Sequence, residues 1–168
     1  MPHRTRLLPA LVAAAGIGAI IVALIAQYGF GLRPCVLCLA QRGPCGAAAV
    51  LGLAALALPV TERFRHRLVT LAALVFLVNA GIAVYHVGVE RHWWASPGCS
   101  ASTAPMPKTV AELLAEAGKP AEVPCDKPAW QWHGITMAGF NIAYSGGLAL
   151  LILLFPRRST RFGRRDRR

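Results

Sequence analysis

The sequence predicts an all-α membrane protein, a four-transmembrane-helix bundle with a long outer loop that carries a short amphipathic helix. Of the 168 residues, 55% are hydrophobic and only 15% are charged, a balance far from that of soluble domains. Lys, Arg, Asp and Glu are also absent from four runs, each long enough to cross a hydrocarbon core that takes roughly 20 helical residues. These runs are Leu7–Leu32, Gly43–Thr61, Leu68–Val89 and Pro128–Pro156.

We place one membrane span in each run and treat residues 1–168 as a single integral membrane domain. Pro44 fits best in the first turn of its span, because inside a helix it removes a backbone hydrogen bond. The first run is longer than the roughly 7 to 15 apolar residues of a signal-peptide core, so a membrane span is favoured over a cleaved leader. The expected spans are residues 8–28, 44–60, 68–89 and 134–155, with outer loops at 29–43 and 90–133.

The basic residues predict the orientation of these spans. In the four-span arrangement 12 of the 18 Lys and Arg residues fall on one side, and the positive-inside rule makes that side cytoplasmic, with both termini. The arginines after Pro156 are therefore a topology signal, and binding of anionic lipid headgroups or RNA is the alternative use of that tail. The 12 residues are Arg4, Arg6, Arg63, Arg65, Arg67, Arg157, Arg158, Arg161, Arg164, Arg165, Arg167 and Arg168.

Four of the five cysteines fall on the opposite, outer side: Cys35, Cys38, Cys99 and Cys125. Thiols that face an oxidising compartment such as a bacterial periplasm form disulfides. A bridge within Cys35-Val36-Leu37-Cys38 closes too short a loop to add much stability, whereas the C-x-x-C spacing commonly lowers a thiol pKa and suits disulfide exchange. Cys45 enters the second span, where a packing role is favoured over one beside a cofactor.

Arg42 strengthens the redox interpretation. If residues 35–42 are helical, offsets of three, four and seven residues place Cys35, Cys38 and Arg42 on one face. A guanidinium there stabilises a thiolate and any anionic reduced cofactor. The alternative is an ordinary interfacial anchor for the second span.

The outer loop contains a helix signal between two turn-rich stretches. Thr109 and Glu112 match the T-x-x-E capping box, and an apolar stripe continues to Ala117, which predicts a short amphipathic helix on the membrane surface. Cys99 and Cys125 lie in turn-rich chain on either side, which we expect to be mobile, and a bridge between them is credible as a structural staple. An interfacial aromatic belt accounts for the four tryptophans, Trp93, Trp94, Trp130 and Trp132.

Together these features resemble the DsbB family of disulfide-bond-formation proteins over nearly the whole chain. The resemblance rests on Pro34-Cys35-Val36-Leu37-Cys38 followed by Arg42, and on an outer loop with Cys99 and Pro124-Cys125 that closes at Trp130. Cys45 and Gly43-Pro44 depart from the pattern. The resemblance implies an enzyme of the bacterial inner membrane that reoxidises a periplasmic DsbA-type dithiol oxidase and passes two electrons to ubiquinone or menaquinone.

The resemblance also implies a role for each site residue. Cys99 receives the partner's thiolate as a mixed disulfide, and Cys125 is its partner in the loop bridge. A transient bridge between Cys35 and Cys125 carries the electrons inward. Cys38 faces the quinone, and Arg42 polarises it. His86, near the outer end of the third span, is a second candidate for the quinone side.

Four rival functions use the same features. Four thiolates could form a closed zinc site, although an oxidising side disfavours free thiolates and we expect no metal. His86 and His133 could ligate a haem in a small electron carrier. A non-enzymatic scaffold stapled by disulfides is the third rival, and a vitamin-K-epoxide-reductase-like enzyme, with a different order of cysteines and spans, is the fourth. We expect no nucleic-acid partner, and no G-x-G-x-x-G after a strand supports a bound flavin or nicotinamide.

Overall fold

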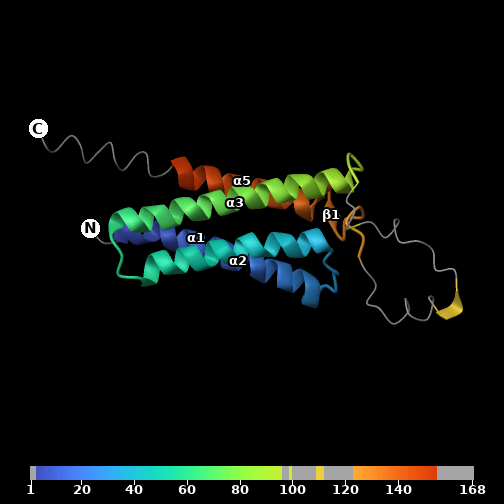
Figure 1. The fold of residues 1–168 in the computed structure, drawn as a ribbon, viewed down its shortest axis with the longest axis horizontal. Coiled ribbons are helices and arrows are strands. Elements are labelled where there is room, and N and C mark those ends of the chain that lie inside the picture. Colours follow the sequence, from blue (N-terminus) through green and yellow to red (C-terminus); the bar gives the residue numbers. More distant parts are fainter. Residues whose placement is uncertain (1–2, 96–98, 100–108, 112–122, 155–168) are drawn as a thin grey trace, which may run out of the picture.

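The computed structural model describes residues 3–95, 99, 109–111 and 123–154. Its elements, in chain order, are α1 (His3–Leu24), the π-helix η1 (Ile25–Gly29), α2 (Val36–Ala57), α3 (Glu62–Glu90), β1 (Gln131–Trp132), β2 (Ile135–Thr136) and α5 (Met137–Leu154). The long helices run side by side as one elongated bundle (Figure 1). Four helical segments, residues 6–29, 36–57, 62–90 and 137–154, are long and apolar enough to cross a membrane. The chain is a four-span, all-α multi-pass membrane protein, as predicted.

The helices pack in sequence order around the bundle. Helix α1 packs on α2, α2 on α3, and α3 on α5, whereas α1 and α5 make few direct contacts. One link between them is the Tyr144 hydroxyl, which donates a hydrogen bond to the Ala15 carbonyl over 2.8 Å. The bundle therefore has a seam between its first and last helices.

Small residues dominate the packing of the bundle from its middle to the end at which α1 begins and α2 ends, which we call the inner half. A Cβ added to Gly16 would lie 2.5 Å from the carbonyl oxygen of Cys45, and one added to Gly52 would lie 2.5 Å from the amide nitrogen of Ala13. Close approach of backbones through small residues is the usual way in which membrane helices associate. The buried cluster of this half consists of Val12, Ala48, Ala55, Val69, Ala72, Ala73, Phe76, Ala149 and Ile152.

The second span differs from the expected residues 44–60. It begins at Val36 with Cys35 as its N-cap, and Pro44 lies inside the helix, so the prediction of Pro44 in the first turn was wrong. A membrane helix tolerates the missing hydrogen bond where neighbouring groups satisfy the freed carbonyl. The helix ends at Ala57, because Leu58 precedes Pro59 and adopts an extended conformation with ψ of 138°.

The third span, α3, begins at Glu62, six residues before the expected residue 68. Thr61 caps α3, since its side chain accepts a hydrogen bond from the Phe64 amide over 3.4 Å. Charged residues therefore occupy the first turns of this helix, and the Arg65 side chain donates to the Ala55 carbonyl of α2 over 2.9 Å. A boundary drawn from the charge-free run misses these interfacial turns.

The other two spans also change at their ends. The first continues from α1 into η1 and ends at Gly29, and the fourth begins at Met137 instead of 134. Residues 131–136 form a hairpin instead, in which Gln131 pairs with Thr136 and Trp132 with Ile135. His133 and Gly134 have positive φ values of 48° and 79°, as two-residue hairpin turns require. The amphipathic helix expected at Thr109–Ala117 lies largely outside the described residues, as does the C-terminal arginine run.

Candidate active site

The C-x-x-C motif straddles the start of α2. Cys35 is extended, with φ of −78° and ψ of 173°, and its sulfur accepts a hydrogen bond from the Cys38 amide over 3.3 Å. Cys38 lies one turn into the helix, and the sulfurs of Cys38 and Cys35 are 2.9 Å apart, within hydrogen-bonding distance. Both thiols are free. The motif thus holds a reduced dithiol at a helix N-terminus, where the backbone amides favour an anion.

Of the two thiols, Cys35 is the more acidic. The Cys38 amide donates to its sulfur, and the Cys38 sulfur at 2.9 Å and Nε2 of His86 at 3.5 Å lie within hydrogen-bonding distance of it. The hydrogen bond from the Cys38 thiol is the largest cause that lowers the pKa of Cys35 to about 4, and His86 and the Cys38 amide also lower it against the opposing effect of burial. Cys35 is therefore a thiolate at neutral pH.

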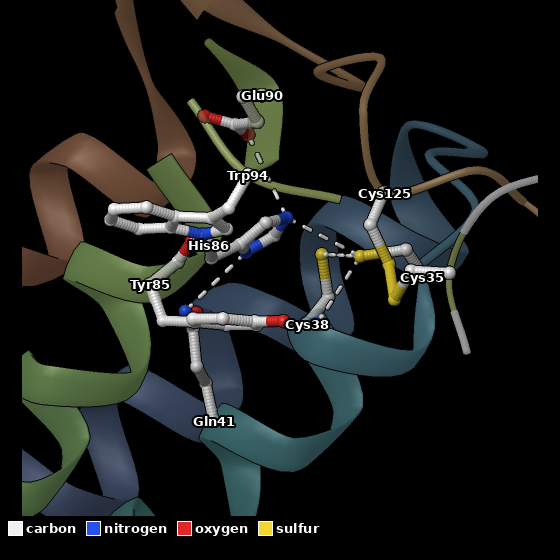
Figure 2. The surroundings of a disulfide bond; sticks show 9 residues. Cys35, Cys38, Gln41, Tyr85, His86, Glu90, Trp94 and Cys125 are labelled. Atoms are coloured by element: carbon white, nitrogen blue, oxygen red, sulfur yellow. Dashed lines mark hydrogen bonds and ion pairs between the residues drawn. A yellow bond between two sulfur atoms is a disulfide. The ribbon is translucent and has the colours of Figure 1, made fainter. Parts of the chain in front are cut away.

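The loop cysteines form a disulfide beside this thiolate. Cys99 and Cys125 are bonded to each other, and the Cys125 amide donates to the Cys99 carbonyl over 2.9 Å. The disulfide packs with Cys35 and Val89 in one buried cluster, and Figure 2 shows Cys125 beside Cys35. The exposed fractions of Cys99 and Cys125 are 7% and 1%, because packing against α2 and α3 removes the apolar sulfurs from solvent.

A buried histidine and carboxylate lie on the other side of Cys35. Oε1 of Glu90 is 3.7 Å from Nε2 of His86, and both side chains are at most 5% exposed. The other oxygen of Glu90 accepts a 2.6 Å hydrogen bond from Thr136, whose hydroxyl oxygen accepts in turn from the Gly139 amide and so caps α5. We identified His86 from the sequence but missed Glu90; its signal is the i, i+4 spacing from His86 at the end of a charge-free run.

Four amide and hydroxyl side chains continue from His86 into the bundle. Nδ1 of His86 is 3.4 Å from Nε2 of Gln41, and Oε1 of Gln41 accepts from Asn141 over 3.1 Å. Beyond Asn141 lie Ser145 and Asn79, and the Asn79 amide reaches the Cys45 sulfur at 3.5 Å. We call Gln41, Asn141, Ser145 and Asn79 the amide ladder. We predicted none of the four from the sequence, although polar residues inside apolar spans are themselves a signal of function.

A cavity of about 550 Å³ opens along the seam between α1 and α5. Cys35, Cys38 and Arg42 line its polar side, together with His86 and Glu90, and Gln41 and Cys45 extend that side inward. Residues of α1 such as Ala19 and of α5 such as Phe140 form the apolar walls. The predicted face of Cys35, Cys38 and Arg42 thus borders one cavity, although within the described residues no hydrogen bond joins Arg42 to either sulfur.

The geometry disfavours two of the rival functions. Cys99 and Cys125 are bonded to each other, so the four cysteines do not form the tetrahedral zinc site; within the described residues, the one group of three possible metal ligands is Cys35, Cys38 and His86. For haem, both ring nitrogens of His86 already face protein side chains, whereas His133 is exposed in the hairpin turn with its ring 4.7 Å from that of Trp132.

Comparison with known proteins agrees with this site. A family model described as "Disulfide bond formation protein DsbB" matches residues 5–155. The chain belongs to the DsbB family. It is also similar to disulfide bond formation protein B of Pasteurella multocida (strain Pm70), with 25% identity over 138 residues that cover 79% of this chain and 75% of that protein. No solved structure gives a significant match. Family membership supports a thiol oxidoreductase that acts in disulfide-bond formation and uses a quinone.

Proposed function

We propose that the protein is a thiol:quinone oxidoreductase of the bacterial inner membrane that reoxidises a periplasmic DsbA-type dithiol oxidase. The observation that carries this proposal is the buried cluster in which a disulfide, Cys99–Cys125, packs against the thiolate of Cys35. A structural staple has no need of a reactive thiolate beside it. Disulfide exchange needs a thiolate and a disulfide in contact.

The exchange steps follow from which sulfurs are adjacent. The partner's thiolate attacks Cys99, the Cys99–Cys125 bond breaks, and Cys125 leaves as a thiolate. Cys125 then attacks Cys35 of an oxidised Cys35–Cys38 pair and releases the Cys38 thiolate. The partner's second thiol next displaces Cys99, which attacks Cys125 and restores the loop disulfide. The partner leaves oxidised, and Cys35 and Cys38 remain as a dithiol.

The arrangement of sulfurs corresponds to the end of that sequence, with a closed loop disulfide and two free thiols at positions 35 and 38. To complete the cycle, this dithiol must lose two electrons and two protons. Ordinary disulfides are too weakly oxidising to regenerate a DsbA-type enzyme, since about 30 mV is a tenfold change in equilibrium for a two-electron couple. The acceptor must therefore be a stronger oxidant in the membrane.

The seam cavity fits a quinone. It combines apolar walls from two membrane-spanning helices, α1 and α5, with a polar side at Cys38, Arg42 and His86, which is the pattern of ligand sites with a few placed polar groups. A quinone bound there supplies the two-electron, two-proton acceptor. Arg42 stabilises negative charge that develops at the site, and Cys38 lines the cavity while Cys35 is engaged with the loop.

The orientation of the protein supports the same assignment. The outer end of the bundle, with all four exchange sulfurs, faces the periplasm when the arginine-rich ends are cytoplasmic. The N- and C-termini then lie in the cytoplasm. A soluble periplasmic dithiol protein reaches Cys99 from outside, and the quinone reaches Cys38 from the bilayer.

Trapping of the mixed disulfide tests the proposal. In Cys125→Ser, Cys99 is a free thiol and the thiol that carries electrons inward is absent. A DsbA-type partner whose resolving cysteine is replaced, and whose remaining cysteine is activated as a mixed disulfide with nitrothiobenzoate, should release nitrothiobenzoate to the attacking Cys99 thiolate and stay attached to Cys99. Mass spectrometry of the trapped complex identifies the sulfur that is joined. Addition of Cys45→Ser to this variant is the matched control and should leave the partner attached to Cys99, because Cys45 takes no part in the exchange steps. A partner joined to Cys35 instead would show that electrons enter by another route.

A further inference from the structure

We propose that Gln41 is a positioning residue that fixes the tautomer of His86, so that the imidazole donates its Nε2–H toward Cys35 and leaves Nδ1 as an acceptor. Two contacts lead to this assignment: Nε2 of Gln41 lies 3.4 Å from Nδ1 of His86, and Nε2 of His86 lies 3.5 Å from the Cys35 sulfur. It rests on the proposed function in one respect, that Cys35 acts as the thiolate of the exchange reaction.

The amide ladder decides which way Gln41 points. The Asn79 amide donates to Ser145 over 2.9 Å and to Asn141 over 3.3 Å, and the Ser145 hydroxyl donates to Oδ1 of Asn141 over 2.9 Å. Because Oδ1 of Asn141 faces these donors, its amide nitrogen faces Gln41 and donates to Oε1 over 3.1 Å. Gln41 is then left with its amide nitrogen toward His86.

The opposite polarity of the ladder is less favourable. As observed, the buried Oδ1 of Asn79 has no hydrogen-bond partner within the described part of the chain, while both hydrogens of its amide group have acceptors. Reversal of every amide would satisfy that oxygen but leave the two N–H groups of Asn79 without acceptors. Buried N–H groups without partners are rarer than under-satisfied carbonyls, so the unpartnered oxygen marks the ladder's direction.

The tautomer determines what His86 can do for Cys35. With Nδ1 held as an acceptor, the neutral ring has its proton on Nε2, where the Cys35 sulfur and, at 3.7 Å, Glu90 lie. The ring then stabilises the thiolate as a donor and does not take up its proton. The other ionisable groups that line the same cavity are Cys35 at the N-cap of α2, Cys38, Arg42 and Cys45 from α2, Glu90 from α3, Tyr144 from α5, and Arg33 and Lys127 from the connections.

Polar residues buried inside membrane spans are costly, so the four residues of the amide ladder call for a functional explanation. Gln41 is 9% exposed, and Asn79 and Ser145 are fully buried. The three helices that contribute the ladder, α2, α3 and α5, already pack through apolar residues in the inner half of the bundle. A polar chain that ends at the imidazole beside the reactive thiol explains why the polar groups lie on the side of the active site.

NMR of the reduced, full-length protein labelled with 15N-histidine in lipid nanodiscs tests the assignment directly. Long-range 1H–15N correlations distinguish Nε2–H from Nδ1–H, and His86→Gln identifies the signal. We expect the Nε2–H tautomer in the wild type. Gln41→Glu places a carboxylate against Nδ1 and should put a proton on that nitrogen. The matched control, Gln27→Glu in η1, should keep the wild-type pattern. An Nδ1–H signal in the wild type, or an unchanged signal in folded Gln41→Glu, would overturn the proposal.

A second variant keeps the test independent of Gln41→Glu folding. Asn141→Leu leaves Gln41 in place but removes the group that orients it, so the His86 signal should split between the two tautomers. Alkylation of Cys35 at pH 5, followed by peptide mass spectrometry, should slow about 3- to 10-fold, as expected for loss of a hydrogen bond to a charged group. A single Nε2–H signal and unchanged alkylation in this variant would refute the ladder's role. The tautomer readout requires no turnover, so it stands or falls separately from trapping of the mixed disulfide.

Discussion

The two halves of the bundle differ in how their buried side chains pack. In the inner half α1 and α2 touch backbone to backbone at Gly16 and Gly52, and the buried cluster is entirely apolar. In the outer half, which holds the cysteine pairs, a cavity of about 550 Å³ separates α1 from α5, and the buried groups include a thiol, an imidazole and a carboxylate. The first half is filled by small side chains, and the second is held open by polar ones.

This difference shows where stability and chemistry reside. Close packing of small residues provides association of helices in lipid without any hydrophobic driving force. The outer half leaves polar and ionisable groups buried at a cost that is tolerated where they are paired. Substitutions in the inner half should therefore change stability while the thiol chemistry survives. Substitutions in the outer half should change chemistry first.

Replacement of the central sulfur should have the largest effect. Cys35→Ser removes the thiolate that exchanges with the loop disulfide, and we expect partner oxidation to fall by about 1000-fold or more, since a serine hydroxyl cannot enter disulfide exchange. The thermal midpoint in detergent should change little, because the bridge at Cys99–Cys125 is intact. Turnover at matched membrane levels measures the first effect. Residual activity near that of the wild type would mean that the loop disulfide bypasses the C-x-x-C motif.

The second effect concerns the pH at which this half of the molecule is reactive. The pKa of Cys35 is lowered from its ordinary value of 9 to about 4, chiefly by the Cys38 thiol. The thiolate is the deprotonated form, so its population is complete at pH 6 and is lost only as the pH falls through 4. Alkylation of Cys35 should hence be nearly constant between pH 6 and 8. As the pH falls from 8 to 6, alkylation of a cysteine introduced at an exposed site by Lys127→Cys should slow about 100-fold, because its thiolate is lost. Parallel slowing of both thiols would contradict the lowered pKa.

The third prediction tests the close-packed half. Gly16→Leu forces a side chain into the backbone of α2, where even a Cβ would lie 2.5 Å from the Cys45 carbonyl, and should destabilise the protein by about 3 kcal/mol. Gly18 lies on the same helix with nothing within 4 Å of its added Cβ, so Gly18→Leu is the matched control and should be neutral. Thermal unfolding in detergent separates them. Equal midpoints would show that α1 is free to move away from α2.

Much of this division could be predicted from the sequence, because hydrophobic runs and basic clusters report the membrane environment directly. The four spans, the C-x-x-C dithiol and the shared face with Arg42 followed from composition and spacing. The position of Pro44 did not, because the N-cap at Cys35 starts the helix two turns earlier than its charge-free run.

What escaped prediction depends on contacts between helices. The amide ladder joins residues as far apart as Gln41 and Asn141, and Glu90 acquires its partner from Thr136 in a hairpin with no clear signal before the last span. The burial of Cys99 and Cys125 likewise depends on α2 and α3. Local patterns contain no information about such partners. A single polar residue inside an apolar span nevertheless points to them, and is worth following whenever it occurs.

Arg42 should show an intermediate effect on the chemistry. Arg42→Lys keeps the charge but loses the planar, multi-donor fork, so quinone affinity should fall while insertion survives. Arg42→Met also loses the charge and should be worse, with about a tenfold loss of turnover at subsaturating quinone. The measurement is the quinone dependence of turnover for both variants at matched membrane levels. Unchanged turnover and apparent affinity in Arg42→Met would reduce this arginine to an interfacial anchor.

The smallest effect should come from Thr136, whose hydroxyl contributes both to the stability of α5 and to the surroundings of Glu90. Its hydroxyl donates to Glu90 over 2.6 Å and accepts from the Gly139 amide over 3.1 Å. Thr136→Val preserves shape but removes both bonds, so the loss of the cap should cost about 1 kcal/mol of stability. Thr136→Ser keeps the hydroxyl and serves as the control. Because Glu90 also lies beside His86, turnover in Thr136→Val should fall about threefold even at a temperature at which the variant is fully folded. A stability loss without any change in turnover would place Glu90 among the groups that hold α3 to α5 and outside the redox site.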